Sequence, residues 1–125
     1  MTGGIAFPSD LEQSAHRSGT EYAWRRADAK RAARHLADFS HAILGGELWL
    51  VHGTEIWGVV PQRVGPPGVY HWAVERGASE PWPSYVARSC SETLAAIDAL
   101  PPEGEAEIPP GADIFYNLTW TNEQQ

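Results

Sequence analysis

Hydrophobic residues recur with two different periods along this chain, and these periods separate predicted strands from predicted helices. Apolar and polar residues alternate over 21–25, which predicts a half-buried strand. Apolar residues then recur at helical spacing over about 29–40, with Asp28 as the expected N-cap. The first third of the chain therefore predicts a strand followed by an amphipathic helix with a basic outer face.

The middle of the chain is rich in strand-forming and turn-forming residues. Residues 42–51 and 55–60 predict the two arms of a hairpin, with turn residues between them. The Gly45-Gly46 pair inside the first arm predicts a bulge or a tight bend. A further alternating strand is expected at 69–75, after a loop rich in proline and glycine.

The last third of the chain predicts one helix and one strand. Trp82-Pro83 marks the start of the helix, because proline is tolerated in the first turn, and Pro101-Pro102 ends it. The final strand has two alternating sets of side chains. We expect the following set to face the core: Ile114, Tyr116, Leu118 and Trp120.

The predicted elements follow in the order β-α-β-β-β-α-β. We expect a single α+β domain over 21–122, in which two helices cover one face of a mainly antiparallel sheet. Residues 1–20 are expected to form a loosely ordered lead-in with one short helical turn, and 123–125 a tail. The length of 125 residues leaves no room for a second domain.

Charge is distributed unevenly along the sequence. There are 16 acidic and 9 basic residues, a formal net charge of −7, and no lysine or arginine follows Arg88. We expect no nucleic-acid partner, because such binders need several phosphate-neutralising cations. The basic residues Lys30, Arg31 and Arg34 of the predicted helix are expected to pair with nearby acids. The acidic balance suits a basic protein partner.

Three features of the sequence bear on location. No apolar run approaches the length that a membrane-spanning helix needs, so we expect no membrane partner. The N-terminus lacks the basic and apolar regions of a secretory signal, which leads us to expect a cytoplasmic chain. The one cysteine, Cys90, cannot form an internal disulfide and is compatible with a reducing compartment.

Residues with catalytic or metal-binding chemistry form no recognisable motif. The five histidines match no metal-ligand spacing, and no nucleophile elbow or phosphate-binding glycine motif occurs. Cys90 falls on the predicted buried stripe of the second helix, where a thiol behaves as a small hydrophobic group. We therefore predict no catalytic residue, metal or cofactor. The alternative is a small enzyme that relies on His71 or His41.

The unusual feature of the composition is its six tryptophans. Trp24, Trp72 and Trp120 share strand parity with other apolar residues and are expected in the core. Trp49 and Trp57 lie in a hairpin that is apolar on both faces, and we expect them to be exposed. If the helices cover one face of this hairpin, a partner protein or a second subunit is the natural cover for the other.

Three segments, in their order and spacing, resemble a known family. They are Tyr22–Ala29, Ile43–Trp49, and Trp82 with Tyr85–Cys90. Together they resemble the small bacterial immunity proteins grouped as Imm40, over roughly residues 15–120. The loops at 61–68 and 101–111 depart from that pattern.

The resemblance implies that the chain binds and neutralises a cognate toxin domain in the cytosol by stoichiometric occlusion, without catalysis. An acidic inhibitor would suit a basic nuclease, although the resemblance does not specify the toxin's activity. The alternative function is a small-ligand binding module with a pocket lined by Trp and Tyr. The candidate toxin contacts are acidic side chains and hairpin aromatics: Glu47, Trp49, Glu55, Trp57, Glu103, Glu105 and Glu107.

Overall fold

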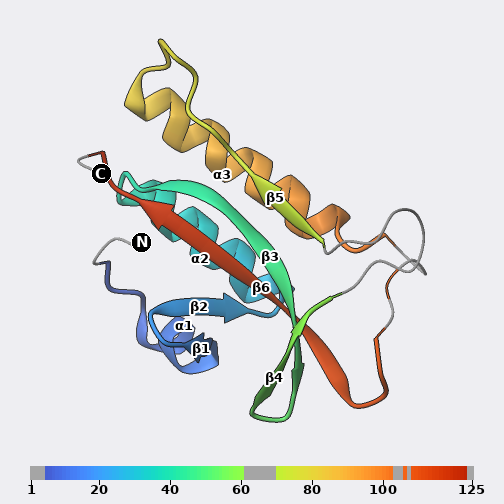
Figure 1. Cartoon of the computed structure of the whole chain (residues 1–125). Helices are drawn as coiled ribbons and strands as arrows, with labels where there is room; N and C mark the ends of the chain where they lie inside the picture. The colour runs from blue at the N-terminus through green and yellow to red at the C-terminus, as the bar shows by residue number, and fades with distance from the viewer. Residues whose placement is uncertain (1–4, 61–69, 103–105, 107, 124–125) are drawn as a thin grey trace.

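The computed structural model of the chain describes residues 5–60, 70–102, 106 and 108–123 (Figure 1). The described residues form an antiparallel sheet and helices in one domain, and the predicted element order is confirmed. The elements are α1 (Ser9–Ser14), β1 (His16–Ser18), β2 (Glu21–Trp24), α2 (Arg26–Asp38), β3 (Ala42–His52), β4 (Glu55–Val59), β5 (His71–Ala73), α3 (Trp82–Ala99) and β6 (Ala112–Thr121).

The sheet is built around its two longest strands, β3 and β6. The strand order is β1-β2-β6-β3-β4, and every pairing is antiparallel. β2 and β3 therefore run in the same direction on either side of β6, and α2 connects them. The outer edge of β3 is divided, since β5 pairs with Gly45–Glu47 and β4 with Trp49–His52.

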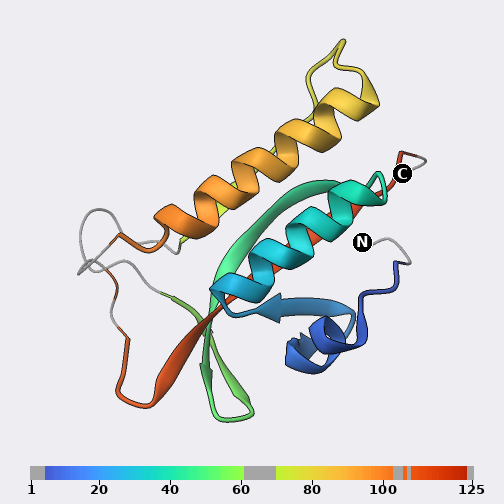
Figure 2. The same ribbon diagram turned by 180° about the vertical axis from the view of Figure 1, so that it is seen from behind.

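Helices α2 and α3 cover one face of this sheet, and no helix of the described residues lies on the other face (Figure 1 and Figure 2). Helix α2 buries Ala29, Ala32, Ala33 and Leu36, so small side chains let it approach the sheet closely. Helix α3 lies beside α2 and packs on β3. We call the opposite side of the sheet the helix-free face.

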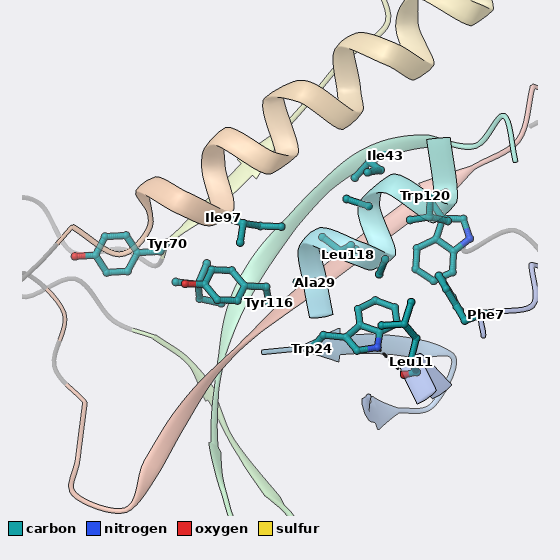
Figure 3. Packing of buried hydrophobic residues seen from close by; sticks show 14 of the residues in the cluster. Phe7, Leu11, Trp24, Ala29, Ile43, Tyr70, Ile97, Tyr116, Leu118 and Trp120 are labelled. Carbon is teal, nitrogen blue, oxygen red and sulfur yellow. Dashed lines mark hydrogen bonds between the residues drawn. The ribbon is translucent and has the colours of Figure 1, made fainter. Parts of the chain in front are cut away.

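The main core lies between the helices and the sheet (Figure 3). At one end Trp24 and Trp120 are 0% and 1% exposed and pack against Phe7. The indole Nε1 of Trp24 donates a hydrogen bond to the Leu11 carbonyl oxygen, 2.8 Å away, so burial of this ring leaves no polar atom unsatisfied. The predicted inward set of β6 is confirmed, with Ile114 only partly buried.

The lead-in is more structured than the sequence pattern indicated. One helical turn was predicted there, and the structure has α1 together with the three-residue strand β1, which pairs with β2. Leu11 of α1 is 1% exposed and closes the end of the core. A strand of three residues is too short to produce a recognisable alternation.

The predicted N-cap of α2 is wrong. The helix begins at Arg26, and Asp28 lies in its first turn, where it pairs with Arg31 at 3.1 Å. The reason is tertiary, because the guanidinium of Arg26 donates to the carbonyl oxygens of Ile97 and Leu100 near the end of α3. Cations stabilise helix C-termini, so this contact fixes the start of one helix at the end of the other.

Candidate protein-binding surface

The β3–β4 hairpin and the start of β6 extend beyond the helices (Figure 1). We call this extension, residues 50–59 with 112–115, the hairpin lobe. Near its tip Trp57 is 49% exposed and stacks on His52, with ring centroids 4.6 Å apart and planes 5° from parallel. The prediction that Trp57 is exposed is therefore confirmed, and Glu55 lies exposed beside the turn.

The prediction that Trp49 is exposed is wrong. Its side chain is 4% exposed, in a second small core on the helix-free face with Ala23, Val51 and Phe115. The ring of His16 on β1 lies 5.7 Å from that of Phe115 and helps to cover this cluster. The sheet thus supplies its own cover for an apolar patch that the sequence left open to a partner.

Trp49 nevertheless contributes to the surface by positioning a carboxylate. Its indole Nε1 donates a hydrogen bond to Oε1 of Glu47, 3.0 Å away. A hydrogen bond to a buried, rotamer-limited ring restricts the carboxylate, which would otherwise sample several rotamers. Two of the sequence-predicted residues are therefore in direct contact, whereas Glu55 and Trp57 lie at the other end of the hairpin.

A groove of about 370 Å³ lies next to this small core on the helix-free face. It crosses β2, β6, β3 and β5, and its floor is shallow because Gly45 pairs with Ala73 on one side and Thr119 on the other. The longer side chains of Glu47 and His71, a cross-strand pair, lie along it. Small residues beside large ones are what produce the hollow.

The groove is lined by acidic and neutral polar groups. Glu21 of β2 and Glu47 of β3 contribute carboxylates, and no lysine or arginine is among its described lining residues. Asn117 of β6 is 2% exposed and donates through Nδ2 to the Tyr22 carbonyl oxygen, 2.9 Å away. Thr119 donates through Oγ1 to the Gly45 carbonyl oxygen at 3.3 Å.

Four of the eight described lysine and arginine side chains form ion pairs, and three of these four lie in the helix layer. The described ion pairs are Arg25–Asp113, Lys30–Asp98, Arg31 with Asp10 and Asp28, and Arg88 with Glu80 and Glu92. The expected pairing of the basic helix is confirmed for Lys30 and Arg31. In contrast, the carboxylates of Glu21, Glu47 and Glu55 form no ion pair with a described residue.

The histidines and the cysteine do not converge on a reactive centre. Within the described ranges, no three His, Cys, Asp or Glu side chains are placed to hold a metal ion. The ring of His41 is hydrogen-bonded locally to the Phe39 carbonyl oxygen, whereas His71 lies on the groove. Burial raises the pKa of the Cys90 thiol, which makes it a poor nucleophile.

Comparison with known proteins gives the family. A family model described as Immunity protein 40, Imm40, matches residues 10–119. The chain belongs to the Imm40 family. Searches against curated proteins and against solved structures gave no match. No helix among the described residues of this Imm40 protein is long and apolar enough to cross a membrane.

The sequence pattern identified only part of the surface of this Imm40 protein. Glu103, Glu105 and Glu107 lie outside the described residues. The pattern missed Glu21 and Asn117, which line the groove. Both belong to the outward sets of alternating strands, so parity alone places them on the helix-free face, but only the strand order brings them together.

Proposed function

We propose that this Imm40 protein binds a cognate toxin domain in the cytosol of the cell that produces it and thereby blocks the toxin. Membership of an immunity-protein family supports the role. The contact surface in this proposal is the hairpin lobe together with the helix-free face. The observation that favours this surface is that its carboxylates Glu47 and Glu55 form no ion pair with a described residue, whereas Lys30, Arg31 and Arg88 on the helices are paired with acids.

The shape of the hairpin lobe supports blocking by occlusion. The lobe extends beyond the helices (Figure 1). Trp57 lies two residues from the turn-closing pair His52 and Glu55 and is half exposed, an arrangement that fits insertion into a concave site. Aromatic side chains supply much of the energy of protein interfaces, and unpaired acids steer association with a basic partner. The small core around Trp49 and Phe115 packs the strands of the lobe against one another. A lobe that is rigid before binding loses less entropy on association.

The proposal predicts a toxin gene immediately upstream of this gene, and the toxin domain that it encodes provides the test. Co-expression of the wild-type protein should restore growth of cells that produce the toxin, and the two proteins should purify as a stoichiometric complex. The variant Trp57→Ala combined with Glu55→Lys should lose protection. The matched variant Asp38→Lys, which places the same basic residue at the end of α2, should retain it. A folded wild-type protein that neither binds the toxin nor restores growth would show that the proposal is wrong.

A further inference from the structure

The groove on the helix-free face offers hydrogen-bond acceptors that the described residues leave partly unoccupied. The carboxylate of Glu21 has no hydrogen bond with a described residue, and of the two oxygens of Glu47 only Oε1 accepts one, from Trp49. The hydroxyl of Thr119 is already used as a donor to Gly45. An anionic ligand would be repelled here, whereas a ligand rich in N–H donors would be attracted.

Asn117 provides the second and independent observation. Its nitrogen must face the Tyr22 carbonyl oxygen, because that oxygen can only accept, and this fixes the orientation of the amide. The amide oxygen Oδ1 then accepts no hydrogen bond from a described residue, although the residue is only 2% exposed. No described side-chain polar atom is both sealed from solvent and unpaired, so Oδ1 remains open to the groove that Asn117 lines.

An acceptor held in this way is suited to a donor that arrives from outside. Because Oδ1 is open to the groove, water can satisfy this acceptor in the free protein. A donor that reaches Oδ1 through the groove replaces that water and meets an acceptor that is already held in position. The carboxylates of Glu21 and Glu47, which line the same groove, favour a donor that carries positive charge.

The lining residues of the groove also favour one kind of cation, the head group of a side chain, over a metal ion. A metal ion is disfavoured, because the described residues contain no group of three or more ligating side chains. The groove instead has room for a head group with its methylenes, and Leu44, 37% exposed, supplies apolar surface beside the acceptors. A guanidinium presents five N–H donors in one plane and matches carboxylate and amide oxygens better than a spherical ion.

We propose that this groove receives one arginine or lysine side chain of the cognate toxin, with Glu21, Glu47 and Asn117 as its hydrogen-bond acceptors. The inference rests on the proposed function, since it names the partner chemistry of one part of that surface. Trp49 is then a positioning residue, because it holds the Glu47 carboxylate in place through Oε1 and leaves Oε2 for the cation. The groove contributes specificity beside the hairpin lobe, which supplies the aromatic contact.

The test compares charge-neutral variants in binding to the inactivated toxin domain encoded upstream. Glu47→Gln and Glu21→Gln should each weaken affinity about tenfold, and the double variant about 100-fold, since each removes a charged acceptor from a desolvated contact. The control Asp38→Asn with Glu123→Gln removes the same charge away from the groove and should stay within about twofold of wild type. A double groove variant with wild-type affinity would overturn the inference.

Nuclear magnetic resonance of the labelled protein gives a readout that charge alone would not move. On formation of the wild-type complex, the indole N–H signal of Trp49 and the carboxamide signals of Asn117 should shift, while the indole N–H of Trp24 in the main core should not. Unchanged Trp49 and Asn117 signals in a formed complex would refute the groove while leaving the proposed function intact. A wild-type protein that forms no complex would refute the proposed function itself.

A double-mutant cycle identifies the cation. Each arginine or lysine of the toxin surface is replaced by alanine and measured against wild-type Imm40 protein and the double groove variant. One replacement should weaken binding to the wild-type protein about 100-fold and have little further effect on the variant, because both remove the same contact. Additive losses for every toxin replacement would show that the groove receives no single side chain.

Discussion

At the scale of single residues, Gly46 decides how closely the central strands approach. A Cβ built on Gly46 would collide with the backbone oxygen of Asn117 and lie 2.6 Å from the ring of Trp72. We predict that Gly46→Ala lowers the free energy of unfolding by about 3 kcal/mol, because a backbone atom of β6 cannot move aside. Urea unfolding followed by tryptophan fluorescence measures this change.

The control for this prediction is Gly53, at the hairpin turn. Its φ of +62° disfavours alanine, but nothing lies within 4 Å of an added Cβ. Gly53→Ala should therefore lower the free energy of unfolding by only about 1 kcal/mol, from backbone strain alone. Equal losses at the two glycines would contradict the packing argument.

Glu80 is a second residue whose effect is local and measurable. Hydrogen bonds from Arg88, and then from the Gly77 backbone N–H, lower the pKa of its carboxyl from 4.5 to about 2. A carboxyl whose pKa is depressed on folding stabilises the fold above the unfolded pKa and loses that contribution as pH falls towards the folded pKa. We predict that Glu80→Gln lowers stability at pH 7 and flattens its decline between about pH 4.5 and 2.

Denaturant midpoints at several pH values test the role of Glu80. The wild-type and Glu80→Gln proteins should differ most above pH 4.5 and converge near pH 2. Glu123→Gln, which changes an exposed carboxylate in no described ion pair, should follow the wild-type curve. A constant difference between Glu80→Gln and wild type at all pH values would show that the Arg88 contact does not depend on ionisation.

At the scale of elements, local signals predicted the hairpin and the helices but not their neighbours. The β3–β4 hairpin was predictable because alternation and turn residues act within a few positions. The start of α2 was not, since Arg26 is held there by carbonyl oxygens more than 70 residues away. The burial of Trp49 was also missed, because its cover comes from β1, β2 and β6. The pairing register between distant strands decides such positions, and local patterns in a single sequence do not reveal that register.

The two hairpin tryptophans lead to a paired prediction at this scale. Trp49→Ala should lower the free energy of unfolding by about 3–5 kcal/mol, because it empties the second core. Trp57→Ala should change stability by less than about 1 kcal/mol, since half of its side chain is exposed, and should weaken toxin binding at least about tenfold. Thermal unfolding and binding measured on both variants separate the structural tryptophan from the contact tryptophan.

At the scale of the whole molecule, the positions of the ion pairs say more about where a partner binds than the net charge of −7 does. Lys30, Arg31 and Arg88 of the helix layer are paired with acids, which weakens the basic helix as a phosphate-binding surface. On the helix-free face and the hairpin, Glu21, Glu47 and Glu55 form no ion pair with a described residue, whereas Asp113 pairs with Arg25. Excess negative potential is therefore expected on the side that the proposal assigns to the toxin. The sequence showed the excess of acid, but the pairing that locates it depends on the fold.

This uneven distribution of negative charge predicts how salt affects the complex with the toxin domain. Steering by unpaired acids acts over distances of about a Debye length, which shrinks from roughly 10 Å to less than half that as salt rises from about 0.1 M to about 1 M. The association rate constant with the toxin domain should therefore fall at least about tenfold over this range, while the dissociation rate constant, set by the Trp57 contact and the groove, changes far less. Stopped-flow association and a chase with unlabelled protein measure the two constants. If salt acted only on dissociation, the free acids would contribute short-range contacts rather than steering, and the electrostatic part of the proposed function would be wrong.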